Sequence, residues 1–159
     1  MQLHTDDAAL ERFQALDDEA GQEALHACCA SPVCVVRVWA GRPYRSRAEL
    51  LDAVEAACRG LDDDQLDLAL AAHPRIGDRP SGSGVEARWS RQEQASVPDA
   101  DAGTRHELVE ANRTYEERFG HVFLIRAAGW SPEEMLSELE RRLAHDAEAE
   151  RAEATDQLA

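Results

Sequence analysis

The sequence predicts an all-α protein, a single-domain bundle of roughly seven to nine helices with a central cleft, spanning residues 1–159. Two observations support this prediction. Apolar residues recur at helical spacing behind hydroxyl or acidic capping residues, and one strand-like run has no second run to pair with it. A chain of 159 residues suits one domain and buries roughly two thirds of the surface that its unfolded form exposes.

The strand-like run covers residues 33–39, where β-branched side chains taken alone favour a strand. A single strand cannot satisfy its own backbone hydrogen bonds. We therefore interpret the run as a short buried helix that begins after Ser31 and Pro32. The next helix follows a capping box formed by Ser46 and Glu49, whose side chains satisfy backbone amides at a helix start.

A helix capped by residues 62–64 is expected to end at His73, because Pro74 disfavours helical geometry at the residue before it. A capping box at Thr104 and Glu107 predicts another helix, with Gly120 as its left-handed stop. Its apolar stripe consists of Leu108, Ala111, Tyr115 and Phe119.

Ser131 and Glu134 form a third capping box, with Pro132 at the first helical position. The buried face of that helix is predicted to consist of Met135, Leu136, Leu139 and Leu143. Residues 146–154 favour helix by propensity but have little apolar face. We expect the last turn of this final helix to be frayed or docked on a partner.

Composition excludes several classes of function. The 17 basic residues are all arginine and are outnumbered by 32 acidic residues. The resulting net charge of -15 repels nucleic acid and anionic lipid surfaces. No run is long and apolar enough to span a membrane, and the amino terminus lacks the pattern of a signal peptide. The four cysteines show no C-x-x-C spacing, so we expect buried free thiols, no metal site and a cytoplasmic location.

Two polar clusters indicate acid/base chemistry. His73-Pro74-Arg75-Ile76-Gly77 places a histidine at a forced chain break, and Ser90-Arg91-Gln92-Glu93-Gln94 supplies a carboxylate beyond a Gly-rich stretch. Either cluster alone is more often structural. Together they are accompanied by several arginines, which predicts a local site for an anionic small molecule; these are Arg75, Arg79, Arg88 and Arg91.

The apolar segment at residues 119–130 is commonly a buried connection between helices. Arg126 lies in its middle, and a guanidinium among apolar residues needs an anionic or backbone partner.

These motifs, together with Trp89-Ser90-x-x-Glu93-Gln94, Asn112-x-x-Tyr115-x-x-x-Phe119-Gly120 and Phe123-Leu124-Ile125-Arg126-Ala127-Ala128-Gly129, resemble the OHCU decarboxylase family in order and near-spacing. Such enzymes act on 2-oxo-4-hydroxy-4-carboxy-5-ureidoimidazoline. The resemblance covers essentially the whole chain. It implies an all-helical, cofactor-free, usually dimeric enzyme that forms (S)-allantoin in the last step of urate breakdown, with the substrate held in the central cleft.

By position, the resemblance implies that His73 and Glu93 are catalytic. It also implies that substrate is held by Pro74, Ser90, Gln94 and the backbone around Ile125, Arg126 and Ala127. One feature departs from the family. Many members continue their last helix into a Leu/Arg-rich ending whose arginine reaches the substrate, whereas this sequence stops at Ala159. Arg126 or another arginine replaces that contact, or binding is weaker, or the substrate differs in detail.

Two other functions fit the same sequence. The scaffold could serve a different small-molecule lyase or hydrolase that keeps the His/Glu pair. It could also be a non-enzymatic helical interaction module that binds partners through its acidic carboxyl-terminal run; in that case His73 is dispensable.

Overall fold

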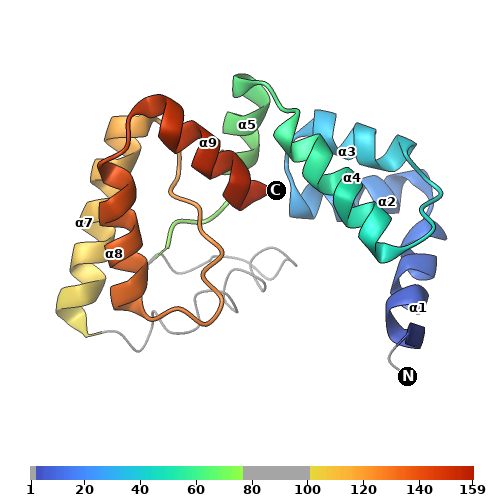
Figure 1. Cartoon of the computed structure of the whole chain (residues 1–159), viewed down its shortest axis with the longest axis horizontal. Coiled ribbons are helices and arrows are strands. Elements are labelled where there is room, and N and C mark those ends of the chain that lie inside the picture. Colours follow the sequence, from blue (N-terminus) through green and yellow to red (C-terminus); the bar gives the residue numbers. More distant parts are fainter. Residues whose placement is uncertain (1–2, 77–100) are drawn as a thin grey trace. The chain divides into compact units, whose positions relative to one another are not determined.

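A computed structural model describes residues 3–76 and 101–159. Within these ranges the protein contains eight helices and no strand, which confirms the predicted fold class (Figure 1). The helices are α1 Leu3–Gln14, α2 Asp18–Cys28, α3 Pro32–Ala40, α4 Arg47–Arg59, α5 Asp63–Ala71, α7 Ala102–Phe119, α8 Pro132–Leu143 and α9 Ala147–Leu158. They belong to two compact units, residues 1–69 with Ala159 and residues 70–158. The single-domain organisation and the central cleft stay predictions.

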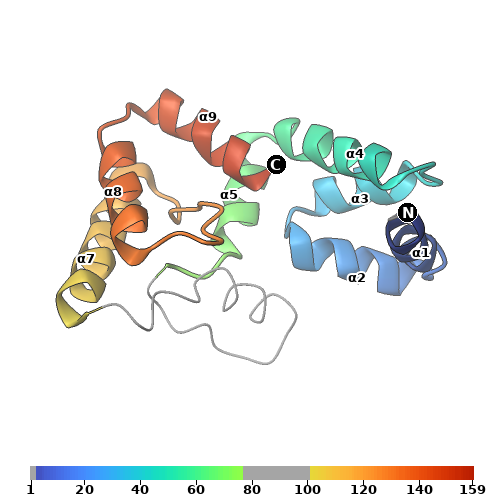
Figure 2. The same ribbon diagram turned by 60° about the horizontal axis from the view of Figure 1, so that its bottom comes forward.

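In the first unit, α3 contacts both α2 and α4 (Figure 2). The run that resembled a strand is this helix, as predicted: Ser31 Oγ accepts the Cys34 amide at 3.2 Å and Pro32 occupies the first position. The buried residues Val35, Val38 and Trp39 share one face at helical spacing. Burial of that face, rather than β-propensity, decides the conformation.

The packing of α2 against α3 depends on a glycine. A Cβ atom at Gly21 would lie 1.9 Å from Cη2 of Trp39, so no larger residue fits without displacing the indole. Trp39 Nε1 donates to Asp18 Oδ1 at 2.9 Å, which fixes the ring in this position. Phe13 of α1 meets the same ring edge to face, at a centroid distance of 5.7 Å.

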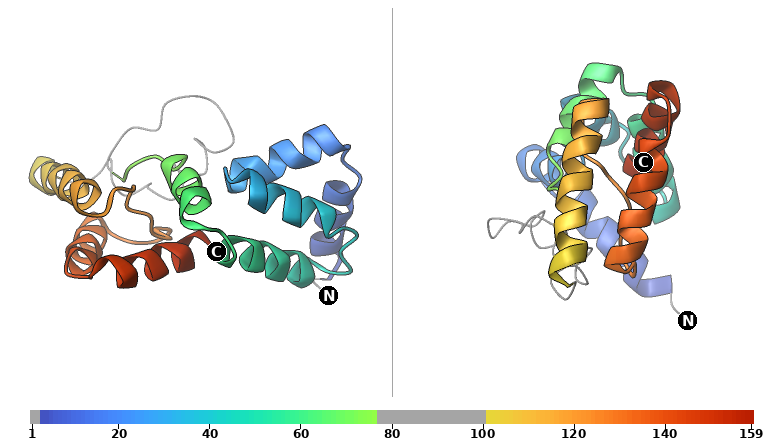
Figure 3. Two further views of the ribbon diagram at one scale, coloured as in Figure 1. Left: turned by 90° about the horizontal axis from the view of Figure 1, so that it is seen from above. Right: turned by 90° about the vertical axis from the view of Figure 1, so that its left-hand side faces the viewer.

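In the second unit, α7 and α8 lie side by side and run in the same direction, with the intervening segment returning along them (Figures 1 and 3). Their fully buried residues include the predicted Leu108, Tyr115, Met135 and Leu139. The capping box of α8 is confirmed, because Ser131 Oγ accepts the Glu134 amide and the Glu134 carboxylate accepts the Ser131 amide.

The start of α7 differs from the prediction. The helix begins at Ala102 and its N-cap is Asp101, whose Oδ1 accepts the amides of Gly103 and Thr104 at 2.7 and 3.0 Å. The predicted capping box at Thr104 and Glu107 is therefore wrong. An aspartate three residues earlier satisfies the same kind of orphan amide and extends the helix by a turn. The predicted stop is confirmed: Gly120 has a φ of 78°.

The thiols are free, as expected, but their burial differs: Cys29, Cys34 and Cys58 are buried, whereas Cys28 is exposed. The expectation of burial is therefore wrong for Cys28, which lies at the solvent side of the last turn of α2. A hydrogen bond with Cys29, followed by burial, raises the pKa of Cys34 to about 11. No described helix combines the length and apolar character needed to cross a membrane.

Candidate active site

His73 lies two residues beyond the end of α5. The start of α5 is capped as predicted, since Asp62 Oδ1 accepts the Gln65 amide at 2.9 Å. The helix ends at Ala71, slightly before the expected position, and the His73 amide still donates to the Leu70 carbonyl at 3.1 Å. Pro74 prevents a further helical turn, so the half-buried His73 side chain stands at a fixed chain break.

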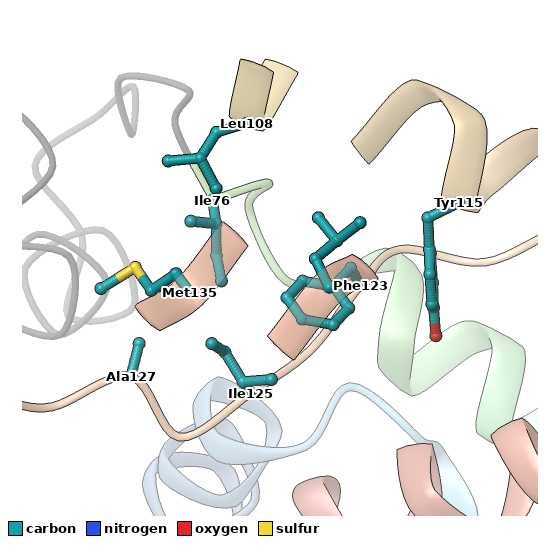
Figure 4. Packing of buried hydrophobic residues seen from close by; sticks show 8 residues of the cluster. Ile76, Leu108, Tyr115, Phe123, Ile125, Ala127 and Met135 are labelled. Carbon is teal, nitrogen blue, oxygen red and sulfur yellow. The ribbon is translucent and has the colours of Figure 1, made fainter. Parts of the chain in front are cut away.

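Ile76 anchors this motif in the core of the second unit. It is 5% exposed and belongs to the same cluster as Ile125, Ala127 and Met135 (Figure 4). Two motifs that are about fifty residues apart in the sequence are thereby attached to one rigid core. The structure thus brings His73 and Pro74 into the same unit as the 125–127 segment.

Asn112 of α7 also holds the motif. Its Nδ2 donates to the Ile76 carbonyl at 2.9 Å and to the Leu108 carbonyl at 2.8 Å. Its Oδ1 is buried and has no hydrogen-bond partner within the described part of the chain. Sequence reasoning assigned no role to this side chain, although it follows Leu108 at i+4 on the apolar stripe, where an amide signals a buried hydrogen bond.

Arg75 is already neutralised. Its Nε and Nη2 donate to the two carboxylate oxygens of Glu116 at 2.5 and 2.8 Å, which is a bidentate ion pair. This pairing opposes the prediction that Arg75 contributes to an anion site. The other predicted participants, Arg79, Arg88 and Arg91, lie outside the described residues.

Between Phe123 and Ala127, buried side chains alternate with more exposed ones. Phe123, Ile125 and Ala127 are buried, whereas Arg126 is exposed. The predicted need of the Arg126 guanidinium is met by backbone: Nη2 donates to the Asp156 carbonyl at 2.7 Å. Its amide donates to Gln157 Oε1 at 3.0 Å.

These two bonds correct the prediction for α9. Its last turn is not frayed, because it is bonded to Arg126 of the same chain. Docking on a partner stays a prediction. The helix has no continuous apolar face, and instead buries two residues, Glu150 and Ala154. Polar contacts thus hold a helix that hydrophobic patterning could not place.

A buried ion pair also supports the 121–131 segment. Arg142 and Glu150 are both fully buried and form a hydrogen-bonded ion pair through Nε at 2.9 Å and through Nη2. Arg142 Nη1 donates to the Leu124 carbonyl at 2.6 Å, and the Tyr115 hydroxyl donates to Glu150 Oε1. Burial, followed by this hydrogen bond, raises the pKa of Tyr115, so its hydroxyl keeps its proton.

Sequence reasoning missed this network. One half was detectable, because Met135, Leu139 and Arg142 follow each other at i, i+4 and i+7 on the buried face of α8. The other half was not, since Glu150 is one of many acidic residues in a helix without an apolar stripe. His145 Nδ1 lies 3.0 Å from Glu150 Oε2 and closes the network.

The profile of the OHCU decarboxylase family matches residues 14–159, which is most of the chain and covers most of the first unit and all of the second. The chain belongs to the OHCU decarboxylase family. A 2-oxo-4-hydroxy-4-carboxy-5-ureidoimidazoline decarboxylase from Amia calva is 30% identical over 80% of this chain and 74% of its own length. The enzyme of the same name from Haloferax volcanii is 29% identical, over 94% and 88% of the two chains.

A third relative is the uric acid degradation bifunctional protein TTL of Arabidopsis thaliana, which is 31% identical over 78% of this chain. The match spans 39% of that longer protein. Among solved structures, an OHCU decarboxylase crystallised in the presence of (S)-allantoin shares the fold with a TM-score of 0.71 at 24% identity, over 86% of this chain and 89% of the other. An (S)-allantoin synthase superposes with a TM-score of 0.67 at 15% identity, over 94% and 49%.

Membership in the OHCU decarboxylase family leaves the site assignments as predictions. The structure places His73 and Pro74 beside the core and Ile125, Arg126 and Ala127 on the anchored segment. Ser90, Glu93 and Gln94 lie outside the described residues. The half of the predicted site that is described therefore lies within one compact unit.

Proposed function

We propose that this protein catalyses the cofactor-independent, stereoselective decarboxylation of 2-oxo-4-hydroxy-4-carboxy-5-ureidoimidazoline to (S)-allantoin in urate breakdown. Family membership over residues 14–159 supports the reaction. The observation that best supports the proposed site is the shared core cluster. In it, Ile76 of the His73 motif packs with Ile125 and Ala127. A proton-transfer group and a substrate-holding backbone segment are thereby mounted on one scaffold.

The proposed chemistry needs no external electron sink. The carbon that loses carbon dioxide lies beside a C=N bond of the substrate, so the electron pair of the broken C–C bond moves into the ring. His73 exchanges a proton with the substrate hydroxyl or the developing enol, and Glu93 orients the imidazole or binds the ureido and ring N–H groups. Delivery of a proton to one face sets the handedness of allantoin. Positioned acid/base catalysis of this kind contributes a factor on the order of 10² to 10⁴ in rate.

Substrate would be held by Pro74, Ser90, Gln94 and the backbone of residues 125–127. The Arg126 amide already donates to Gln157, so binding through that amide requires the Gln157 side chain to give way. Binding through the flanking residues does not. The Arg126 guanidinium is bonded to the Asp156 carbonyl of α9.

The interaction-module alternative needs an α9 that is available to a partner. In the structure α9 buries Glu150 and Ala154 and bonds to Arg126 within its own chain. These intramolecular contacts favour the enzyme.

The decisive test measures optical activity, because the substrate also decays spontaneously to racemic allantoin. Urate is converted by the upstream oxidase and hydrolase with and without this protein, and the circular dichroism of allantoin is followed. Wild-type protein should give (S)-allantoin, whereas His73→Asn should lose roughly 10² to 10⁴ in turnover while remaining folded.

His106→Asn is the matched control, since it makes the same substitution at an exposed position of α7 in the same unit. It should retain full turnover. Racemic product with wild-type protein would refute the proposed reaction, and near-normal turnover of His73→Asn would refute the role of His73. Glu93→Gln tests the carboxylate in the same assay.

We further propose that the chain acts as a single functional domain, forms a homodimer and works in the cytoplasm. The family resemblance supports the dimer, and the four free cysteines agree with a reducing compartment. Sedimentation velocity should show a species of twice the chain mass, and a monomer at micromolar concentration would contradict the dimer.

A further inference from the structure

Three thiols converge in the interior of the first unit, and none of them is assigned a role in decarboxylation. Cys29 is the C-cap of α2, Cys34 lies in α3 and Cys58 lies in α4. They are 5%, 3% and 1% exposed, and their sulfur atoms all lie within 4.8 Å of one another. Because the three residues come from separate elements, no C-x-x-C motif indicates the cluster in the sequence.

The spacing of the sulfur atoms matches what a shared metal ion requires. Two thiolates bound at about 2.3 Å to one ion are separated by about 3.8 Å at a tetrahedral angle and about 4.0 Å at a trigonal angle. Cys34 Sγ and Cys58 Sγ are already 3.8 Å apart. Bringing Cys29 into the same sphere requires a shift of less than about 1 Å, which is within the range of a side-chain adjustment.

The kind of ligand atom determines which metal ion this site would bind. Among the described residues, no imidazole or carboxylate joins this group, so the ligands are thiolates alone. Soft thiolates favour Cu(I) and other soft cations, whereas structural Zn²⁺ prefers four ligands in a tetrahedron. Three buried sulfur donors therefore fit Cu(I) better than Zn²⁺.

A positively charged side chain lies close to the cluster. Arg37 of α3 donates from Nη1 to the Gly60 carbonyl at 2.9 Å, which fixes its side chain at the end of α4. Its positive charge interacts favourably with a thiolate at Cys34. A Cu(I) complex of several thiolates is anionic, and a nearby guanidinium offsets part of that charge.

We propose that Cys29, Cys34 and Cys58 form a binding site for Cu(I), which would link α2, α3 and α4. The ion displaces the thiol protons and forms three Cu–S bonds without a change in oxidation state. Since binding to the folded state alone stabilises that state, loading should raise the melting temperature of the first unit.

The test titrates fully reduced protein, under anaerobic conditions, with Cu(I) supplied as its bicinchoninate complex. The colour lost by the chelator reports transfer, and one Cu(I) per chain is expected. X-ray absorption at the copper edge should show a shell of sulfur alone. A parallel titration with Zn²⁺ should show weaker binding.

Cys28→Ser is the matched control because this thiol is exposed, is adjacent in sequence to Cys29 and lies outside the cluster. It should bind one Cu(I) as the wild type does. Cys34→Ser and Cys58→Ser should each weaken transfer at least tenfold, and Cys29→Ser provides a third variant at a helix end if a core serine impairs folding. Far-ultraviolet circular dichroism checks that each variant is folded.

Two outcomes would overturn the proposal. One is no transfer of Cu(I) to folded, reduced wild-type protein, which would make the cluster ordinary thiol packing. The other is transfer that survives in the three cluster variants, which would place the ion elsewhere, for example at His145, Glu150 and Glu153. Neither outcome depends on decarboxylase activity, so failure here leaves the proposed function intact.

Discussion

The two compact units differ in what they bury. The first encloses three thiols among apolar side chains, and the second encloses the ion pair of Arg142 and Glu150 together with Tyr115. Packing of thiols and apolar groups depends mainly on volume and tolerates small shifts. A buried guanidinium fixes directions as well as distances, because each N–H needs an acceptor.

That difference bears on function. The proposed substrate segment has little regular structure of its own and takes its position from Arg142, which binds the Leu124 carbonyl, and from α9. An apolar core could not hold a backbone carbonyl in a chosen orientation. The unit that carries His73 is thus also the unit with a fully buried ion pair in its interior.

Arg142→Ala should show the largest effect. Its loss leaves Glu150 buried without its cation and the Leu124 carbonyl without its donor, which costs roughly 3–5 kcal/mol in the free energy of unfolding. The turnover of Arg142→Ala should also fall, because the Leu124 carbonyl loses its donor. Urea unfolding measures the stability, and hydrogen exchange should show lost protection in residues 121–131 but not in α3.

Arg141→Ala is the matched control, one residue away on α8 and about half exposed (49%). Its partners Glu138 and Glu153 are reachable by water, so the loss should be roughly 0–1 kcal/mol. Equal losses for the two variants would contradict the special contribution of the buried ion pair.

Tyr115→Phe should have the next largest effect. It keeps the aromatic contacts with Phe119 and Phe123 but removes the hydroxyl that donates to Glu150. A buried carboxylate that loses a donor costs roughly 1–3 kcal/mol. Thermal unfolding monitored by circular dichroism measures this loss, and a variant as stable as wild type would show that the hydroxyl is dispensable.

Cys58→Ala in the first unit should cost less, about 1 kcal/mol, because it removes one sulfur atom and leaves no charge unpaired. Cys34 would lose a thiol neighbour at 3.8 Å, which is a weak contact. Urea unfolding of the metal-free protein provides the measurement. A loss above that of Tyr115→Phe would reverse the proposed ranking of the two interiors.

Glu138→Gln should have the smallest effect and depend on pH. Hydrogen bonds from Arg141 hold the pKa of Glu138 below its usual range. A carboxyl group with a lowered folded pKa stabilises the protein above its unfolded pKa, and that contribution disappears as pH falls through the folded pKa. The stability difference from wild type, about 1 kcal/mol or less at neutral pH, should vanish in acid and shrink in high salt. A difference that is constant from neutral to acidic pH would contradict this origin.

Local signals predicted much of the fold. Ser46 and Ser131 cap helices as expected, since a hydroxyl that precedes an apolar periodic run is typically an N-cap. Ser31 caps α3, the helix that was predicted to follow it. The Thr104 prediction failed because Asp101 competes for the same role, and short-range rules do not rank two adjacent caps.

The sequence by itself determined the helical class, the chain break at His73, the family and the need of Arg126 for an anionic or backbone partner. Each follows from local spacing or from motifs that keep their order. Only the tertiary structure decided which carbonyl binds Arg126, that Arg142 and Glu150 are buried together, and that three dispersed cysteines share one interior. These are pairings between helices, and the hydrophobic periodicity of a helix specifies which face is buried but not which buried residue it meets.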